Sequence, residues 1–334
     1  MEETSNETVL PPWICTFPDF TRTKLATKAS YVYSYLSIIA ILSFLIIITN
    51  SIILIAMILN KKLHRSRYVL ILNLCISDLL VGLIFPVVVW GGAGVGDILG
   101  SIVSFVSMLT ILSIAIERFL KIVLCPYSKK LATSRQLIAV CGGIWLMSAV
   151  LFFSVIDKPE AYGYLYHFII PVLLFIILVV IIVLYLLIFM NVNKQEVSQS
   201  QRSTIKRGKF IKSKRVLEGF VMIVALYICC YLPWGVESFR IGILMARNEQ
   251  DICWRGTIPL YFTICIGILN AVLNPFIYWR RLPDFGDSVK ALFKCCCGKY
   301  DSKDFENNDS STTLARQNSR LSNYTKENTI KHNN

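Results

Sequence analysis

Two amides and a proline interrupt an apolar run in the segment Ile268-Leu-Asn270-Ala-Val-Leu-Asn274-Pro275-Phe-Ile-Tyr278. Proline removes a backbone donor and kinks a helix, and buried amides must find hydrogen-bond partners. The alternative is a tolerated proline with unrelated polar neighbours. Polar residues within a membrane span usually face the interior of a helix bundle and mark function. We therefore expect this segment to form part of a functional polar site.

An aspartate stands in a second apolar run, within Ser77-Asp78-Leu79-Leu80. A carboxylate at mid-span costs several kcal/mol unless it is paired or loses its charge. Asn50 and Ser107 are polar residues of two further apolar runs. Because hard cations take oxygen ligands, an aspartate surrounded by hydroxyl and amide oxygens suits Na⁺ or a proton. The alternative is that each polar side chain satisfies a separate contact between helices.

We predict that these polar residues meet at one level of a helix bundle and form a sodium pocket, with Asp78 as the metal ligand. The predicted members of this pocket are Asn50, Asp78, Ser107, Asn270 and Asn274. The eleven cysteines show no CxxC or Cys/His spacing, which argues against zinc. Apart from an allosteric Na⁺, no cofactor is expected.

Seven apolar runs are long enough to carry these residues across about 30 Å of hydrocarbon, which takes roughly 20 helical residues. The runs cover residues 31–57, 69–90, 98–123, 136–155, 166–189, 217–245 and 257–279. The 334-residue chain is 55% hydrophobic and 16% charged, with a mean hydropathy of +0.59, which is typical of membrane proteins. The sequence therefore predicts an all-α membrane protein whose residues 31–279 form a seven-transmembrane helix bundle.

Positive charge is concentrated in alternate connections between the runs. The segments after runs one, three, five and seven carry clusters of Lys and Arg, whereas the other connections carry at most two. This asymmetry places the N terminus outside and the C terminus in the cytosol of a multi-pass plasma-membrane protein. It also explains the net charge of +13 without nucleic-acid binding. Residues 1–30 are then extracellular, and Asn6 of Asn6-Glu7-Thr8 is a glycosylation acceptor.

Short motifs occur in order on the expected spans. They are Asn50, Leu74-x-x-x-Asp78, Glu117-Arg118-Phe119, Trp145, Cys230-Tyr231-Leu-Pro233 and Asn274-Pro275-x-x-Tyr278. Each motif is short, but the ordered set resembles the rhodopsin-like G-protein-coupled receptors over nearly the whole ordered chain, residues 31–297. The resemblance implies an extracellular ligand, a heterotrimeric G protein and arrestin as partners. It also implies that the signal is transmitted by outward movement of helix six.

The resemblance assigns roles to individual residues. Arg118 matches the arginine that meets the G protein, and Tyr278 matches the tyrosine that swings inward on activation. Asp78 and its predicted neighbours match the family's sodium pocket. The residues implied in coupling and activation are Glu117, Arg118, Phe119, Tyr185, Tyr231, Pro233, Asn274, Pro275 and Tyr278.

The chain departs from the family pattern at several positions. Tyr231 stands where the family usually has tryptophan, and Tyr185 follows Pro171 at a longer interval than usual. Ser213 and Lys214 stand where the family often has an acidic residue. We therefore expect a weak inactive lock between the third and sixth spans.

The usual extracellular disulfide is also missing, because the outer cysteines of run three and of the second outer loop are absent. Cys15 and Cys253 are the clearly extracellular cysteines, and the oxidising exterior makes them a predicted replacement pair. The alternative is two free or separately buried thiols.

Missing outer cysteines together with a short second outer loop, residues 156–165, resemble the melanocortin, cannabinoid and lysophospholipid receptor branch. Asp97 lies twenty-one residues before Arg118, almost six helical turns above it and close to the same face. Melanocortin receptors pair an aspartate at the matching place with a basic group of the peptide, so the resemblance implies a cationic peptide or small molecule as ligand. The alternative is that Asp97 only caps the third span.

The cytosolic end has three expected parts. Residues 282–294 show the amphipathic pattern of a short eighth helix, within a juxtamembrane domain of residues 280–297. Cys295, Cys296 and Cys297 suggest palmitoylation, and the alternative is reduced thiols. Residues 298–334 are polar and expected to be a disordered cytosolic tail.

A second functional class is an ion-coupled membrane transporter that uses the Asp78 cluster. Transporters usually show internal repeats and broken spans in matching halves, and no such symmetry is present. A membrane enzyme is not expected, because the sequence contains neither HExxH nor GxSxG.

Overall fold

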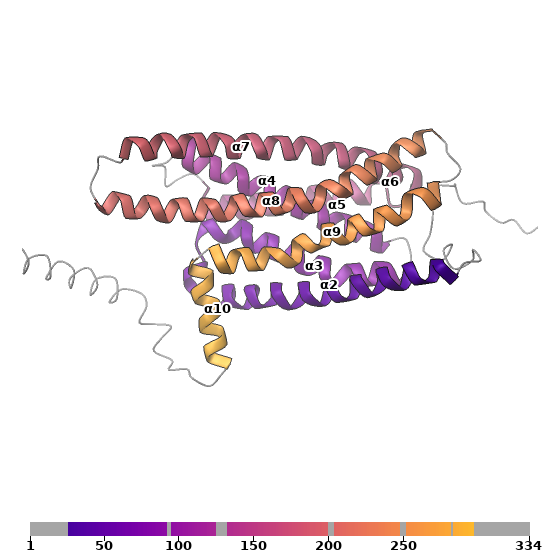
Figure 1. Cartoon of the computed structure of the whole chain (residues 1–334), viewed down its shortest axis with the longest axis horizontal. Helices are drawn as coiled ribbons and strands as arrows, with labels where there is room; N and C mark the ends of the chain where they lie inside the picture. The colour runs from indigo at the N-terminus through magenta and orange to yellow at the C-terminus, as the bar shows by residue number, and fades with distance from the viewer. Residues whose placement is uncertain are drawn as a thin grey trace, which may run out of the picture. The chain divides into compact units, whose positions relative to one another are not determined.

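Helices form nearly all of the described chain. The computed structural model describes residues 26–91, 95–124, 132–199, 204–247, 252–281 and 283–296, and no strand occurs within these ranges. The α-helices, labelled in Figure 1, are α2 (Ala26–Leu59), α3 (Val69–Gly91), α4 (Val95–Phe119), α5 (Ser134–Phe153), α6 (Pro159–Tyr164), α7 (Ile170–Gln199), α8 (Thr204–Ala246), α9 (Ile252–Arg281) and α10 (Pro283–Cys296). Two π-helical turns, η3 (Leu120–Leu124) and η4 (Leu165–Ile169), continue α4 and precede α7.

Seven segments of the described chain are long and apolar enough to cross a membrane. They are Tyr33–Leu59, Val69–Val87, Gly96–Leu124, Ser134–Phe153, Glu160–Val192, Val224–Ala246 and Pro259–Arg280. Each overlaps one of the apolar runs in the sequence, so the predicted seven-transmembrane bundle is confirmed.

Unlike a water-soluble protein, the described bundle carries many large apolar side chains on its outside and several buried polar ones inside. Large apolar side chains point outward, among them Ile41, Phe44 and Leu146 with 61–68% of their surface exposed. Asn50 and Asp78, in contrast, are at most 1% exposed. Because hydrocarbon offers polar groups no partners, such groups must find them inside the bundle. The polar residues of the apolar runs therefore face inward.

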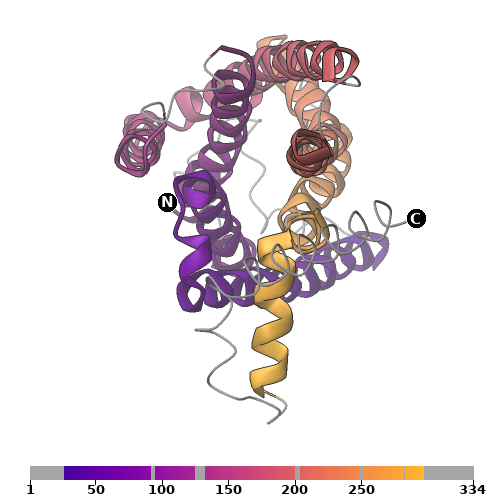
Figure 2. The ribbon, with the colours of Figure 1, turned by 90° about the vertical axis from the view of Figure 1, so that its left-hand side faces the viewer.

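The helices pack in sequence order around the bundle. α3 packs against both α2 and α4, α8 packs against both α7 and α9, and α2 closes the arrangement against α9. Figure 2 looks along the helices and shows α5 at the margin, where it packs against α4 and α3. An apolar core that includes Ile39, Ile46, Val81 and Ile268 fills the space between α2, α3 and α9.

The second outer connection is shorter than the sequence predicted. Residues 156–165 were expected to form a loop, but α5 ends at Phe153 and α6 already begins at Pro159. Proline suits the first position of a helix because its fixed φ is preset for it and its missing N–H would have no partner there. From α6 the chain passes through η4 directly into α7, so the fifth span begins at Glu160. The loop assignment was therefore wrong for residues 159–165.

The predicted eighth helix is present as α10, which starts two residues after α9 ends. Phe285 at its start is fully buried, with its ring centroid 5.2 Å from that of Tyr68 and 6.0 Å from that of Tyr278. A Cβ on the next residue, Gly286, would lie 2.9 Å from the backbone oxygen of Trp279. Glycine is therefore needed for the close approach between the end of α9 and the start of α10.

Candidate functional site

The carboxylate of Asp78 is the centre of a polar cluster inside the bundle. Ser107 on α4 donates to Asp78 Oδ1 over 3.3 Å, and Asn274 on α9 donates to Oδ2 over 2.8 Å. All three side chains are buried. The sequence predicted that these residues of three different spans would meet, and the structure brings them together.

Asn50, a further predicted member, has a different set of hydrogen bonds. Its amide nitrogen donates to the backbone oxygens of Ile46, over 3.1 Å, and Ala271, over 3.0 Å. Ala271 precedes Pro275 by four residues, so the missing N–H of this proline leaves the Ala271 carbonyl without its helical donor. Asn50 on α2 satisfies this carbonyl and ties α2 to α9 at the proline.

Several amide oxygens near this level lack hydrogen-bond partners. Neither amide atom of Asn270 has one among the described residues, nor do the side-chain oxygens of Asn50 and Asn274. Asn270 and Asn274 are completely buried, and buried polar atoms are normally paired. One carboxylate and several neutral oxygens form a donor set that suits a hard cation of low charge. These residues therefore fit Na⁺.

Two hydrogen-bonding features of the core were not predicted. Ser77 lies 2.8 Å from Ser107, oxygen to oxygen, and so extends the cluster along α3. Trp145 on α5 donates to Asn73 Oδ1 over 3.0 Å, while the Asn73 amide donates to Thr110 over 2.7 Å. The second chain of bonds links α5, α3 and α4. Asn73 is a polar residue in an apolar run, which is the signal that could have identified it.

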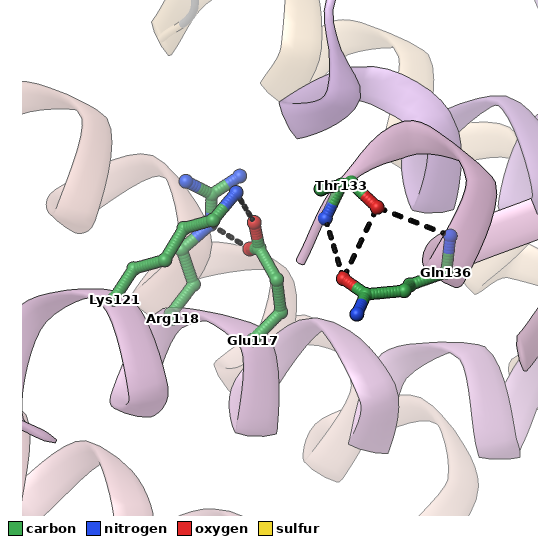
Figure 3. Close-up of polar contacts among 5 residues, drawn as sticks. All are labelled: Glu117, Arg118, Lys121, Thr133 and Gln136. Carbon is green, nitrogen blue, oxygen red and sulfur yellow. Dashed lines mark hydrogen bonds and ion pairs between the residues drawn. The ribbon is translucent and has the colours of Figure 1, made fainter. Parts of the chain in front are cut away.

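A cluster of charges lies at the end of α4, and Figure 3 shows it. Glu117 Oε2 lies 3.0 Å from Arg118 Nε, and its Oε1 lies 2.6 Å from Lys121 Nζ. Glu117 is only 4% exposed. The figure also shows Thr133 and Gln136, whose reciprocal hydrogen bonds form a capping box at the start of α5. Glu117 and Arg118, two of the predicted coupling residues, therefore form an ion pair, and Lys121 is a second, unpredicted cation on the same carboxylate.

The turn that follows Arg118 is held by the fifth span. The side-chain amide of Asn191 on α7 donates to the backbone oxygen of Ile122, a residue of η3, over 3.1 Å. A π-turn displaces its carbonyls from the regular α-helical pattern and often occurs at functional sites. Tyr185 lies on the same helix, and its buried hydroxyl, like that of Tyr278, has no hydrogen-bond partner among the described residues.

The predicted activation residues of the sixth span lie on α8. The Tyr231 ring packs 4.5 Å from that of Tyr227 one turn earlier, and Pro233 lies within the helix. Trp234 follows directly and is in edge contact with Tyr166 of η4, with centroids 5.5 Å apart. An aromatic contact between the sixth span and η4 is thus next to the proline. Phe119, another residue of the predicted activation set, is the last residue of α4.

Asp97 lies in the first turn of α4, two residues after the helix begins at Val95. Its backbone oxygen accepts hydrogen bonds from Ser101, over 2.8 Å, and from the hydroxyl of Tyr162, over 3.4 Å. Asp97 is therefore inside the helix rather than at its cap. A negative charge in the first turn still interacts favourably with the helix dipole. The stacked rings of Tyr162 and Tyr166 lie beside it in the structure.

Some predicted sites cannot be placed. Asn6, Cys15, Cys297 and the tail of residues 298–334 lie outside the described residues, as do the side chains of Cys253, Cys295 and Cys296. The predicted disulfide, glycosylation and palmitoylation stay predictions.

Comparison with known proteins identifies the family. The family model described as "7 transmembrane receptor (rhodopsin family)" matches residues 49–278. The chain is 25% identical to lysophosphatidic acid receptor 4 of Homo sapiens over 289 residues, covering 74% of this chain and 76% of that protein. It is 25% identical to C-X-C chemokine receptor type 1 of Rattus norvegicus over 318 residues, covering 83% and 84%. It is also 21% identical to adenosine receptor A3 of Ovis aries over 298 residues, covering 79% and 90%.

The fold is similar to that in the crystal structure of squid rhodopsin, with a TM-score of 0.65 at 20% identity over 85% of this chain and 92% of that one. These matches give the transporter alternative no support. With its seven spans, its ordered motifs and a family match that covers most of the bundle, the chain belongs to the rhodopsin family of seven-transmembrane, G-protein-coupled receptors.

Proposed function

We propose that this receptor transmits its signal by switching between two packings of α8 and α9 around Asp78. A cation at Asp78 favours the inactive packing, whereas an agonist favours an inward Tyr278 and an outward α8. A ligand shifts such a balance only by its differential affinity for the two packings. The supporting observation is the bond from Asn274 to Asp78, because it joins the polar core to the part of α9 that Pro275 weakens.

Two tyrosine hydroxyls support the same proposal. Tyr185 and Tyr278 are at most 8% exposed, and neither hydroxyl has a hydrogen-bond partner within the described part of the chain. An unpaired buried hydroxyl is unfavourable. A rearrangement that gives both hydroxyls partners would therefore lower the free energy of the alternative packing.

Nucleotide exchange on purified G proteins tests the proposal. Receptor in lipid nanodiscs is mixed with each class of heterotrimeric G protein, and the exchange rate is compared with that of the G protein alone. We expect acceleration for at least one class and its loss in Arg118→Leu. Arg135→Leu is the matched control, because Arg135 is exposed at the start of α5. No acceleration with any class would contradict the proposal.

The proposed location of the receptor is the plasma membrane, with its N terminus on the extracellular side. The clusters of Lys and Arg that follow α2, α4, α7 and α9 support this orientation. An epitope tag before Met1 should be stained on intact cells, whereas a tag after Asn334 should be stained only after permeabilisation. The reverse pattern would contradict the assignment.

The proposed ligand is a cationic peptide or small molecule that pairs with Asp97. The names of the three relatives point to a lysophospholipid, a nucleoside and a chemokine, which are chemically unlike one another. The relatives therefore do not select a ligand, and the proposal depends on the carboxylate of Asp97. A ligand screen in cells that report cAMP and calcium together is the direct test.

Arrestin binding and three modifications complete the proposal. Phosphates on the tail would supply docking charge for arrestin, Asn6 would carry a glycan, and cysteines 295–297 would be acylated. Cys15 and Cys253 would form a disulfide over the mouth of the bundle. Intact-mass analysis under non-reducing conditions tests the disulfide, and free thiol at both positions would exclude it.

A further inference from the structure

We propose that Tyr162 and Ser101 form a hydrogen-bonded clasp that ties the outer end of α4 to the start of the fifth span. The clasp takes the place of the extracellular disulfide that this chain lacks. It goes beyond the proposed function, because it concerns how the mouth of the bundle is held together and depends on neither the ligand nor the G protein.

The connection between the fourth and fifth spans shows why another tie is needed. The usual disulfide would join the outer end of the third span to the second outer loop, and both of these segments lack a cysteine. The connection is reduced to residues 154–158, between α5 and α6. Because α6, η4 and α7 follow one another without a break, a contact from α6 acts on the fifth span itself and not on a loop.

The hydroxyl groups of Tyr162 and Ser101 lie 2.9 Å apart, oxygen to oxygen, although 61 positions separate the two residues in the chain. The Ser101 hydroxyl donates to the backbone oxygen of Asp97 over 2.8 Å. A serine hydroxyl has one proton, and this bond uses it, so Tyr162 is the donor to Ser101. The Tyr162 hydroxyl also lies 3.4 Å from the same Asp97 oxygen. The tyrosine therefore holds the first turns of α4 at two oxygens.

The surroundings of the clasp are apolar. Ser101 is 7% exposed, and Ile98 and Ile102 beside it on α4 are each 4% exposed. A hydrogen bond in such surroundings is electrostatically stronger than one in water, and an unpaired hydroxyl there is costly. Opening of the clasp is therefore unfavourable for both hydroxyl groups.

Aromatic contacts extend the clasp to the sixth span. The ring of Tyr162 stacks on that of Tyr166, with centroids 5.7 Å apart, and Tyr166 is in edge contact with Trp234 on α8 at 5.5 Å. Ser238 on α8 donates to the backbone oxygen of Tyr166 over 3.2 Å. The outer ends of the third, fifth and sixth spans are thus joined through Tyr162.

Hydrogen–deuterium exchange of the full-length receptor in lipid nanodiscs tests the clasp. Tyr162→Phe keeps the stacked ring and removes only the donor. We expect it to raise amide exchange in residues 99–106 of α4 about threefold, as for loss of one hydrogen bond between membrane helices. In the Ser101→Ala background, where the acceptor is already gone, Tyr162→Phe should have little further effect. Tyr164→Phe is the matched control, because Tyr164 is on the same helix and 50% exposed, and it should leave the exchange unchanged.

Unchanged exchange of α4 in Tyr162→Phe overturns the inference. An equal rise in α3 and α5 also overturns it, because the variant would then loosen the whole bundle and not the outer end of α4. An effect of Tyr162→Phe that is as large in the Ser101→Ala background as in the wild type would show that the hydroxyl acts on another group. Treatment of the wild type with a phosphine reductant should leave α4 unchanged, and a loosening as large as that expected for Tyr162→Phe would assign the tie to a disulfide and overturn the clasp.

Discussion

Asn274 donates a hydrogen bond to Asp78 Oδ2 over 2.8 Å, although 196 positions separate the two residues in the chain. The next residue after Asn274 is Pro275, and the carbonyl that this proline leaves without a helical donor is satisfied by Asn50 over 3.0 Å. The carboxylate of Asp78 on α3 and the segment of α9 around Pro275 are therefore held by neighbouring hydrogen bonds. A change in the charge at Asp78 acts directly on the part of α9 that can bend.

Asp78→Asn should remove the sodium dependence of receptor stability. In the wild type, replacing an organic cation by Na⁺ at equal ionic strength should raise the melting temperature, because a ligand that binds only the folded state stabilises it. At a concentration ten times the dissociation constant the gain is about 1.4 kcal/mol. Asparagine keeps the shape of the side chain but has no charge, so the sodium-dependent shift should vanish.

Ser148→Ala is the control for this experiment. Ser148 is fully buried on α5, and its hydroxyl donates to the Ile144 oxygen of its own helix. Its replacement also removes a buried polar group but leaves the cluster intact, so the sodium-dependent shift should remain. A sodium response that persists in Asp78→Asn would mean that the pocket is assigned wrongly.

The sequence alone predicted the meeting of Asp78, Ser107 and Asn274, since each is a polar residue of an apolar run and only the bundle interior offers partners. It did not predict the bond from Asn50 to the Ala271 oxygen. That bond depends on how α2 is positioned along α9, which no local pattern encodes.

The second cation on Glu117 was also missed. Lys121 lies near the end of the third apolar run, residues 98–123, where no pairing with Glu117 was predicted, and η3 brings its Nζ to 2.6 Å from the carboxylate. A π-turn adds one residue to a helical turn and has no reliable sequence signal. The loop predicted for residues 156–165 was wrong for residues 159–165, because α6 and the start of η4 are helical there.

The bonds that join Trp145, Asn73 and Thr110 should behave as one unit. Trp145→Phe removes the donor to Asn73 Oδ1, and Asn73→Leu removes both bonds. Each change should lower the free energy of unfolding by about 1 kcal/mol, as for interhelical hydrogen bonds in membranes. The double variant should lose less than the sum of the two single variants. Thermal unfolding in detergent measures all three.

Trp279→Phe is the matched control for this cycle, because Trp279 is 46% exposed at the end of α9. Its effect should be small and should add to that of Asn73→Leu. Strict additivity of Trp145→Phe and Asn73→Leu would show that the bond between them contributes nothing to stability.

Replacement of each of two glycines by alanine should change the free energy of unfolding in opposite directions. A Cβ at Gly242 on α8 would lie 2.5 Å from the His167 oxygen and 3.0 Å from its carbonyl carbon, whereas a Cβ at Gly143 on α5 would meet nothing within 4 Å. Backbone atoms cannot turn away, so Gly242→Ala should lower the free energy of unfolding by about 1–3 kcal/mol. Gly143→Ala should raise it by up to about 1 kcal/mol through helix propensity. Equal melting temperatures for the two variants would mean that η4 does not approach α8 this closely.

The role of Asp97 can be decided by separating its charge from its place in the helix. Asp97 lies in the first turn of α4, and its backbone oxygen accepts bonds from Ser101 and Tyr162 that a change of side chain need not disturb. If the carboxylate pairs with a cationic agonist, Asp97→Asn should reduce agonist potency about tenfold or more at unchanged surface expression, since a charge-assisted bond is lost. Glu160→Gln is the control, because it removes an exposed carboxylate of α6 and should leave potency unchanged. If Asp97→Asn keeps full potency while Asp97→Ala only lowers expression, Asp97 stabilises the start of α4. The hypothesis of a cationic ligand must then be abandoned.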